Sequence, residues 1–78
     1  MIKLYCTRFC SDCQKARALF DAHNIRYEMI DINKDESGKK YVMGVNNGNC
    51  SVPTILFEDG TLLVEPSIAE LLTKIQET

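Results

Sequence analysis

Three of the four cysteines of this chain lie close together near its N-terminus, in the segment CTRFCSDC. Cys6, Cys10 and Cys13 have the spacing CxxxCxxC, which suits three kinds of chemistry. All three thiolates could hold an iron–sulfur cluster for radical chemistry, or they could bind a soft metal such as Cu(I) or Zn(II). Alternatively, Cys10 and Cys13 could form a redox-active CxxC pair. The segments that position these cysteines distinguish among the three possibilities.

Hydrophobic periodicity predicts that the cysteine segment lies between a strand and a helix. Strand-forming residues occupy positions 2–5, and apolar residues at helical spacing then predict a helix from Cys10 or Ser11 to near Asn24. Residues 25–32 begin with alternating apolar and polar side chains, which predicts a second strand of about six residues. Because a helix joins these two strands, we expect them to be parallel.

The second half of the chain predicts a weaker helix, a hairpin and a final helix. The weaker helix ends at 46–49, where Asn and Gly tolerate the left-handed conformation that terminates helices. Residues 54–64 predict an antiparallel hairpin that turns at an Asp-Gly pair. Ser67 and Glu70 form the S-x-x-E pattern of a capping box at the start of the final helix. The expected core stripe of that helix is Ile68, Leu71, Leu72 and Ile75.

These elements predict a single α/β domain over residues 1–78, in the order β-α-β-α-β-β-α, with a mixed four-stranded sheet and three packed helices. The chain is 45% hydrophobic and 26% charged, which is ordinary for a globular protein. Its net charge of −2 gives no basic surface that would favour nucleic acid or an anionic membrane. With no apolar run long enough to span a bilayer and no signal peptide, we expect a cytoplasmic protein, and we expect it to be a monomer.

The predicted order of elements bears on the three possible chemistries. Radical enzymes with clustered cysteines need a barrel of about 200 residues or more to enclose cofactor and substrate. Small copper-handling modules of similar length have the order βαββαβ and end in a strand, whereas this chain is expected to end in a helix. In a reducing cytoplasm, a close CxxC pair is more often catalytic or metal-binding than a structural disulfide. The redox interpretation therefore accounts for the most residues.

In that interpretation Cys10 lies at the N-cap of the first helix, and Cys13 lies one turn inside it. The free N–H groups and the positive end of the helix macrodipole stabilise a thiolate at the N-cap. Arg8 adds a nearby cation, whereas Asp12 adds a like charge, so we expect a net lowering of the pKa of Cys10 that Asp12 tempers. Cys13 is spaced to resolve a mixed disulfide formed on Cys10.

Two segments carry a resemblance to a known family. LYCTRFCSDCQKARALF resembles the first strand, active site and first helix of the glutaredoxin family, within the thioredoxin-like superfamily. Ser51-Val52-Pro53 is similar to the TVP segment of that family, whose proline is cis and faces the active cysteine. The segment VNNGNCSVPTILFEDGTLLVEPS is especially similar to the mycoredoxin branch. The resemblance covers essentially the whole chain and implies a glutaredoxin-type, thioredoxin-like fold.

The resemblance also implies roles for residues of the cysteine segment. Cys10 matches the nucleophile of the family, and Cys13 matches its resolving thiol. Phe9 stands where an aromatic side chain often packs beside the nucleophile. The implied activity is thiol–disulfide oxidoreduction, in which protein disulfides or mixed disulfides are reduced with a low-molecular-weight thiol and neither a bound cofactor nor a metal is required.

Substrate contacts are implied on two other segments. The backbone of Val52, before the expected cis Pro53, would pair with the substrate's cysteine like one extra strand. The amides of Ser67 and Ile68 would hold a substrate carboxylate, which is also what the N-terminus of a helix favours. Glu65-Pro66 replaces the Gly-Gly pair of glutathione-using members, and Glu65 would repel a glutathione carboxylate.

Other partners and functions remain open from the sequence. The electron donor could be glutathione, a different small thiol, or a flavoenzyme of the thioredoxin-reductase type. The same cysteines could instead bind Cu(I) or Zn(II), or an iron–sulfur cluster bridging two copies. The chain could also be a dedicated electron donor to a reductase such as ribonucleotide reductase, whose redoxins share the YVM of the second helix but not VEPS.

Three further residues have a simple structural interpretation and a functional one. Cys6 ends the first strand and is expected to be a small buried residue rather than a redox thiol or ligand. Cys50 is expected to be a neutral loop residue, although the loop should approach the active site. His23 is expected on the inner face of the first helix, near its C-terminus, where it packs or caps the helix.

Overall fold

A computed structural model gives the fold of residues 1–77. These residues form seven elements in the predicted order β-α-β-α-β-β-α. The elements are β1 (Ile2–Cys6), α1 (Ser11–Ala22), β2 (Tyr27–Asp31), α2 (Glu36–Val45), β3 (Thr54–Leu56), β4 (Leu62–Val64) and α3 (Ile68–Gln76). None of the helices in this part of the chain has the length and hydrophobicity that a bilayer crossing requires.

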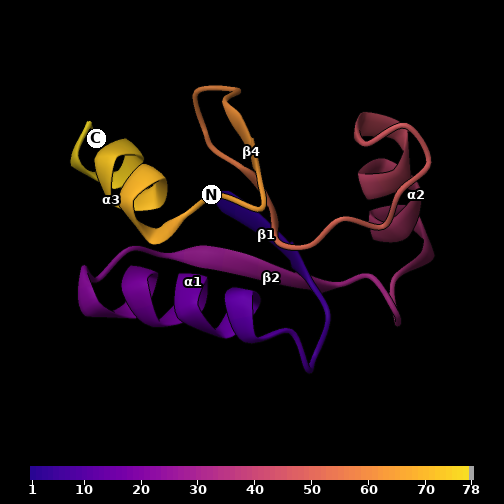
Figure 1. Cartoon of the computed structure of the whole chain (residues 1–78), viewed down its shortest axis with the longest axis horizontal. Coiled ribbons are helices and arrows are strands. Elements are labelled where there is room, and N and C mark those ends of the chain that lie inside the picture. Colours follow the sequence, from indigo (N-terminus) through magenta and orange to yellow (C-terminus); the bar gives the residue numbers. More distant parts are fainter. Residues whose placement is uncertain (78) are drawn as a thin grey trace.

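The strands form one mixed sheet in the order β2-β1-β3-β4, and Figure 1 labels β1, β2 and β4. β1 pairs with β2 in parallel and with β3 antiparallel, and β4 is antiparallel to β3. Tyr5 in β1 lies opposite Thr54 in β3, which in turn lies opposite Val64 in β4. The end of β1, the start of β3 and the end of β4 therefore lie side by side at one end of the sheet.

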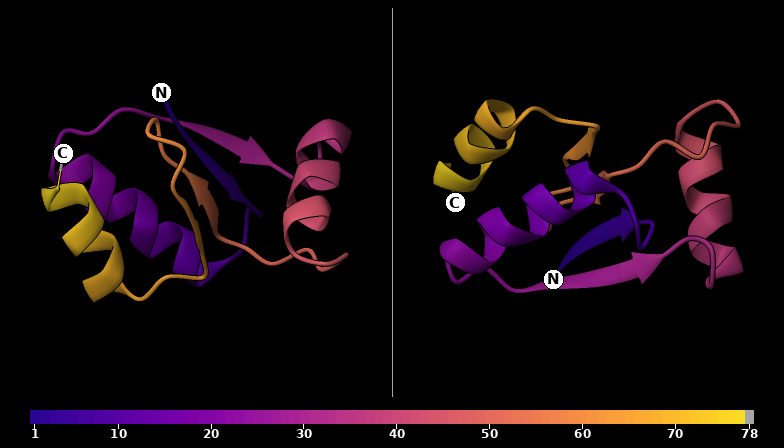
Figure 2. Two further views of the ribbon diagram at one scale, coloured as in Figure 1. Left: turned by 90° about the horizontal axis from the view of Figure 1, so that it is seen from above. Right: turned by 60° about the horizontal axis from the view of Figure 1, so that its bottom comes forward.

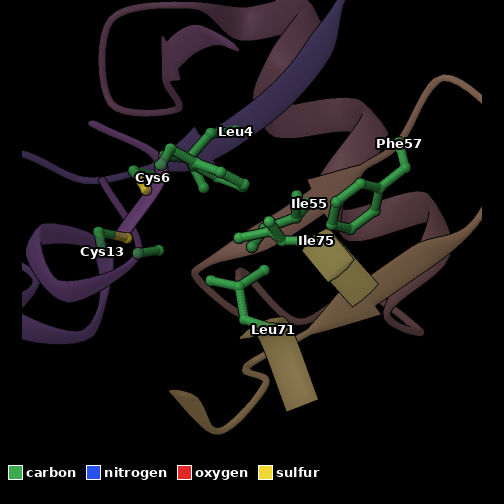
Figure 3. Close-up of a cluster of buried hydrophobic side chains, with 9 residues drawn as sticks. Leu4, Cys6, Cys13, Ile55, Phe57, Leu71 and Ile75 are labelled. Carbon is green, nitrogen blue, oxygen red and sulfur yellow. The ribbon is translucent and has the colours of Figure 1, made fainter. Parts of the chain in front are cut away.

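Helices cover both faces of this sheet (Figures 1 and 2). Side chains alternate along β1, so Leu4 and Cys6 face one side while Tyr5 faces the other. α1 and α3 lie side by side on the first face, and α2 lies on the second. The larger core cluster, on the α1–α3 face (Figure 3), consists of Leu4, Cys6, Cys13, Ala16, Phe20, Ile55, Phe57, Leu71 and Ile75.

The first helix buries one narrow stripe against β1. Cys13, Ala16 and Phe20 recur at spacings of three and four, which places them on one helical face, and all three are buried. The helix ends at Ala22, two residues before the predicted end, because Asn24 takes the left-handed conformation with φ 55°. His23 occupies the C-cap as expected, but its side chain is exposed, so its predicted place on the inner face is wrong.

The last helix has the predicted capping box and a narrower core stripe than predicted. The Glu70 amide donates to Ser67 Oγ at 3.1 Å, and the Ser67 amide donates to Glu70 Oε1 at 3.0 Å. Leu71 and Ile75 are buried, but Ile68 in the first turn is 44% exposed. Its prediction as a core residue is therefore wrong: Ile68 lies at a groove that it lines together with Asp12 and Lys15 of α1.

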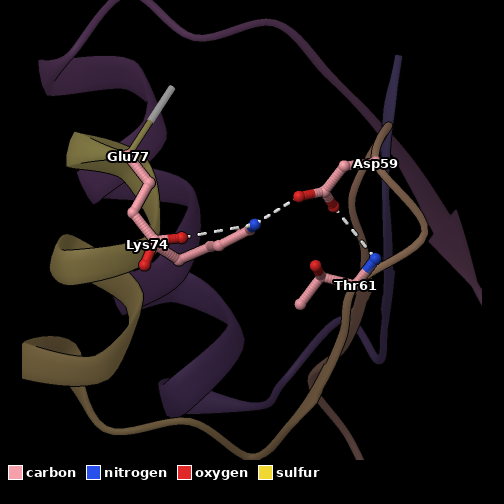
Figure 4. Close-up of polar contacts among 4 residues, drawn as sticks. All are labelled: Asp59, Thr61, Lys74 and Glu77. Carbon is pink, nitrogen blue, oxygen red and sulfur yellow. Dashed lines mark hydrogen bonds and ion pairs between the residues drawn. The ribbon is translucent and has the colours of Figure 1, made fainter.

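A polar contact fixes the other end of α3 (Figure 4). Lys74 forms ion pairs with Asp59 in the β3–β4 turn and with Glu77 at the end of its own helix. Its ammonium also lies 5.5 Å from the centroid of the Phe57 ring. The Asp59 carboxylate accepts a second bond from the Thr61 amide at 2.9 Å, and Lys74 holds the pKa of Asp59 well below its usual range. The contact ties α3 to the hairpin.

Two glycines of α2 provide a matched test of the packing of this helix on the sheet. A Cβ at Gly38 would lie 2.6 Å from Ile30 Cγ2, whereas a Cβ at Gly44 would meet nothing within 4 Å. We expect Gly38→Ala to lower the free energy of unfolding by about 1–3 kcal/mol because of overpacking. Gly44→Ala should raise it by up to about 1 kcal/mol because alanine favours a helix. Urea unfolding of both variants checks this, and equal effects would contradict the described packing.

Candidate active site

The sheet topology brings the predicted site segments to the same end of the sheet. Cys10 follows the end of β1, the Val52-Pro53 pair precedes β3, and Ser67 follows the end of β4. The Glu65 amide donates to the Pro53 carbonyl at 2.8 Å, which joins the second and third of these segments directly. The positions that the sequence singled out are thus neighbours in the fold.

Cys10 occupies the predicted N-cap position of α1. Its backbone is extended, with φ −79° and ψ 117°, and its Sγ accepts the Cys13 amide at 3.4 Å. A half-buried sulfur at this place faces the free amides of the first helical turn. This is the position at which a thiolate gains hydrogen bonds and a favourable helix dipole.

The pKa of Cys10 is nevertheless raised, so the predicted lowering has the wrong sign. Burial is the largest cause, because a partly desolvated sulfur loses more solvation as a thiolate than as a thiol. The Cys13 and Asp12 amides lower the pKa, while the thiol of Cys13 raises it. Within residues 1–77, the charges of Arg8 and Asp12 are not among the main causes. Sequence reasoning counted nearby charges but could not measure desolvation.

Arg8 and Phe9 form an exposed pair beside the nucleophile position. The Arg8 guanidinium carbon lies 5.6 Å from the centroid of the Phe9 ring, and the Phe9 side chain is 87% exposed. The cation is therefore placed over an aromatic face, a weak attraction at an exposed site. Phe9 offers apolar surface to solvent and does not pack inward.

Cys13 lies deeper than Cys10, against the end of β1. Cys13 is 1% exposed and Cys6 is 0% exposed, which confirms that Cys6 is buried. Figure 3 shows the two side by side, Cys6 at the end of β1 and Cys13 in the first turn of α1. The Cys6 side chain and burial strongly raise the pKa of Cys13, which therefore keeps its proton at neutral pH.

The Val52-Pro53 peptide bond is cis, as the sequence predicts. Pro53 is buried, and Val52 is half-buried and packs against both core clusters. Cys10 packs on the α1–α3 core cluster as Val52 does, so the nucleophile position and the cis-proline loop share one apolar base.

Asn46 anchors this loop, a role that sequence analysis missed. Its Nδ2 donates to the Val42 carbonyl at 2.9 Å and to Thr54 Oγ1 at 3.3 Å. The Thr54 hydroxyl donates in turn to the Ser51 carbonyl at 2.7 Å. The available signal was an Asn at the end of a helix, which reveals the cap but not the partner that the fold brings to it.

A groove of about 380 Å³ lies between the starts of α1 and α3. The residues that line it are Asp12, Lys15, Glu65, Pro66, Ser67, Ile68 and Glu70. Three of these side chains are acidic and one is basic, so the groove is negative overall. The Ser67 amide, which was predicted to hold a substrate carboxylate, already binds the Glu70 carboxylate. Sequence analysis missed Lys15, although it lies one turn after Asp12 on the same helical face.

Glu65 has an unusual backbone conformation at the rim of this groove. Its φ is 48°, in the left-handed region that favours glycine, and it precedes Pro66, which disfavours helical conformations in the residue before it. Its amide bond to the Pro53 carbonyl holds it there. A charged side chain therefore stands where a glycine would be unstrained.

All four cysteines are free thiols, and Cys50 is exposed in the loop before the cis proline. Within residues 1–77, no group of three or more His, Cys, Asp or Glu side chains is arranged to hold a metal ion. The CxxxCxxC spacing therefore brings the sulfurs of Cys6, Cys10 and Cys13 into one region without arranging them as a metal site.

Known proteins resemble this chain in sequence and in fold. The family profile described as Glutaredoxin matches residues 2–63. The chain is 35% identical over 75 residues to mycoredoxin 1 of Corynebacterium glutamicum, covering 96% of this chain and 92% of the relative. The structure of a glutaredoxin from Archaeoglobus fulgidus matches with a TM-score of 0.75 at 23% identity, covering 96% of this chain and 85% of that one. A buckwheat glutaredoxin in complex with glutathione matches with a TM-score of 0.70 at 18% identity, covering 97% and 68%. The structural matches confirm the predicted fold.

The raised pKa of Cys13 makes the stability of the reduced protein dependent on pH. The folded state holds this proton more tightly than the unfolded chain, so the stabilisation is complete below about pH 8.5 and is lost as the pH rises above it. We expect the free energy of unfolding to fall between about pH 8.5 and 9.5, by at most about 1.4 kcal/mol per pH unit for this group. Cys13→Ala should make the decline shallower, and Cys50→Ala should not. Urea unfolding under a phosphine reductant measures both, and equal slopes in the two variants would contradict the assignment.

Proposed function

Because this chain belongs to the glutaredoxin family, whose members are thiol–disulfide oxidoreductases in general, we propose that it reduces disulfides with Cys10 as nucleophile and Cys13 as resolving thiol. The observation that carries the proposal is the Cys13 amide donating to Cys10 Sγ at the N-cap of α1. This arrangement exposes one sulfur to a substrate and keeps the second within reach, behind the first.

The proposed cycle has two exchange steps. Cys10 loses its proton and attacks one sulfur of a disulfide, which forms a mixed disulfide on Cys10 and releases the other sulfur as a thiolate. A second thiol then attacks this mixed disulfide. When Cys13 attacks Cys10 Sγ, the bound group leaves as a thiolate, and the Cys10–Cys13 disulfide that remains needs two external thiols for its reduction. When an external small thiol attacks the sulfur of the bound group instead, Cys10 leaves as a thiolate and the bound group departs in a disulfide with that thiol.

The environment of Cys13 favours the external thiol in the second step. Cys13 is 1% exposed and its raised pKa leaves little thiolate near neutral pH. Since only the thiolate attacks, Cys13 is a slow competitor whenever a small thiol is abundant. We therefore propose that the protein reduces mixed disulfides of small thiols efficiently with an external thiol, and that it reduces protein disulfides through Cys10 and Cys13 together.

The substrate chain is proposed to bind along the cis-proline loop. Val52 and Cys10 pack on the same apolar cluster, which supports placing a substrate cysteine bonded to Cys10 beside the Val52 backbone. Main-chain pairing between the substrate and Val52 would act like one extra short strand at this end of the sheet. Phe9 supplies exposed apolar surface at the entrance of this site.

The groove supports a preference for small thiols that carry few carboxylates. The buckwheat relative has been crystallised with glutathione, so a low-molecular-weight thiol is the class of donor that the comparison favours. Here Asp12, Glu65 and Glu70 line the groove beside the single cation Lys15. A glutathione carboxylate at the start of α3 would have to displace Glu70 from the Ser67 amide. An uncharged thiol avoids both the repulsion and the competition.

The two cysteines should respond differently to serine substitution. Cys10→Ser should abolish reduction of every disulfide, because no nucleophile remains at the N-cap of α1. Cys13→Ser should lose the reduction of protein disulfides but retain at least about a third of the activity on mixed disulfides of small thiols. A thiol-coupled reduction assay with both substrate types measures this. Full turnover of Cys10→Ser would refute the proposed function.

The acidic groove can be tested by removing one charge at Glu65. Glu65→Gln should lower the KM for a glutathione mixed disulfide about threefold at low salt, because one repulsive charge is removed. The KM for the uncharged mixed disulfide of 2-mercaptoethanol should not change. Glu28→Gln, which removes an exposed charge on β2 outside the groove, is the matched control. Equal effects on the two substrates, or from the two variants, would contradict the role of the groove.

A further inference from the structure

A third thiol adjoins the proposed pair and has no part in the cycle described above. Cys6 is 0% exposed and lies in the same core cluster as Cys13. The Cys13 side chain lies beside the Cys6 side chain in this cluster (Figure 3), and the Cys13 amide donates to Cys10 Sγ. Cys13 is thus the middle thiol of three: Cys6 lies beside it in the core (Figure 3), and the half-buried Cys10 accepts its amide at 3.4 Å.

We propose that Cys6 is a third redox thiol, which exchanges with the Cys10–Cys13 disulfide to form a buried Cys6–Cys13 disulfide and return Cys10 to the thiol state. This inference rests on the proposed function, because that cycle supplies the Cys10–Cys13 disulfide. It adds a second oxidised form of the protein in which the nucleophile is free.

The exchange is balanced and needs no external reagent. Cys6 gives up its proton and its sulfur attacks Cys13 Sγ, so that the Cys6–Cys13 bond forms and the Cys10–Cys13 bond breaks. Cys10 leaves as a thiolate and takes up the proton that Cys6 has lost. The number of disulfides stays at one, and no net electron enters or leaves the protein.

The fold explains why Cys13 can reach both sulfurs. Cys6 is the last residue of β1, and the alternation of the strand points its side chain toward α1, on the same side as Leu4. Cys13 lies in the first turn of α1 on the buried face of the helix. A disulfide needs its two sulfurs at about 2.05 Å, so only side chains that lie side by side, as Figure 3 shows for Cys6 and Cys13, can form one.

The chemistry of the two oxidised forms differs in a way that matters for function. In the Cys10–Cys13 form the protein cannot attack a new disulfide. In the Cys6–Cys13 form Cys10 is a single nucleophile without a resolving partner, and an external thiol must complete each cycle. The buried disulfide is also shielded from small thiols, because both of its sulfurs lie in the core. Oxidation would thus convert a dithiol protein into a monothiol one.

The test follows the position of the disulfide in a Cys50→Ser background, which removes the exposed fourth thiol. The reduced protein is oxidised by a slight excess of 2-hydroxyethyl disulfide, freed of reagent, incubated, quenched in acid and labelled with a maleimide under denaturing conditions. Peptide mapping then identifies the labelled and the linked cysteines. We expect Cys10 to be labelled at least about tenfold more than in a Cys6→Ala control, in which it stays linked to Cys13, and we expect Cys6 and Cys13 to be recovered as one linked peptide. A Cys6 that stays fully labelled at all times would overturn the proposal.

A second variant keeps the proposal testable if Cys6→Ala does not fold. In Cys10→Ser, Cys50→Ser only Cys6 and Cys13 remain, and refolding from denaturant in the presence of diamide, which gives the oxidant access to both sulfurs before they are buried, should protect both from labelling within one molecule. Two labelled thiols after oxidation would overturn the proposal. A failure of the proposed function would give a different result, namely reductase activity that survives in Cys10→Ser. The positions of the disulfides are mapped without any activity assay, so the two failures can be told apart.

Discussion

The packing of α1 on the last residues of β1 is the contact on which the rest of the site depends. Cys6 and Leu4 of β1 meet Cys13, Ala16 and Phe20 of α1 in one buried cluster, which fixes where the helix begins. Because the helix begins at Ser11, Cys10 becomes its N-cap and receives the Cys13 amide. A shift of the helix by one residue would rotate Cys13 away from the sheet and remove Cys10 from the free amides of the first turn.

The same contact sets opposing demands on the sulfurs. The amides of the helix start stabilise a Cys10 thiolate, yet the cluster that positions the helix also desolvates the sulfur and raises its pKa. For Cys13 the Cys6 side chain and burial, which raise the pKa, outweigh the Cys10 side chain and the Thr7 backbone, which lower it. The same packing therefore sets both the position and the reactivity of the two thiols. Cys10 stays accessible to a substrate, whereas the buried Cys13 keeps its proton.

The segments that would bind the substrate lie at the end of the sheet where β1 and β4 finish and β3 begins. β3 runs antiparallel to β1, and β4 antiparallel to β3, so the cis-proline loop and the start of α3 must meet the start of α1. Asn46 and the Glu65 amide hold these two segments in place. The groove between the helix starts is acidic because Asp12, Glu65 and Glu70 line it, and Glu65 stands there in a left-handed position that glycine would occupy without strain.

The sequence by itself determined the element order, the N-cap position of Cys10, the cis proline and the family, since periodicity, the capping pattern and the CxxC and VP segments are local signals. Tertiary structure decided what depends on neighbours distant in sequence. Desolvation raised the pKa of Cys10, whereas the sequence predicted a lower one. Ile68 and His23 were predicted to face inward but are exposed, because the buried core does not extend to them. The interaction of Cys6 with Cys13 belongs to the same class. Spacing showed that the sulfurs could meet, but only the pleat of β1 and the buried face of α1 decided that Cys13 lies next to Cys6 as well as Cys10.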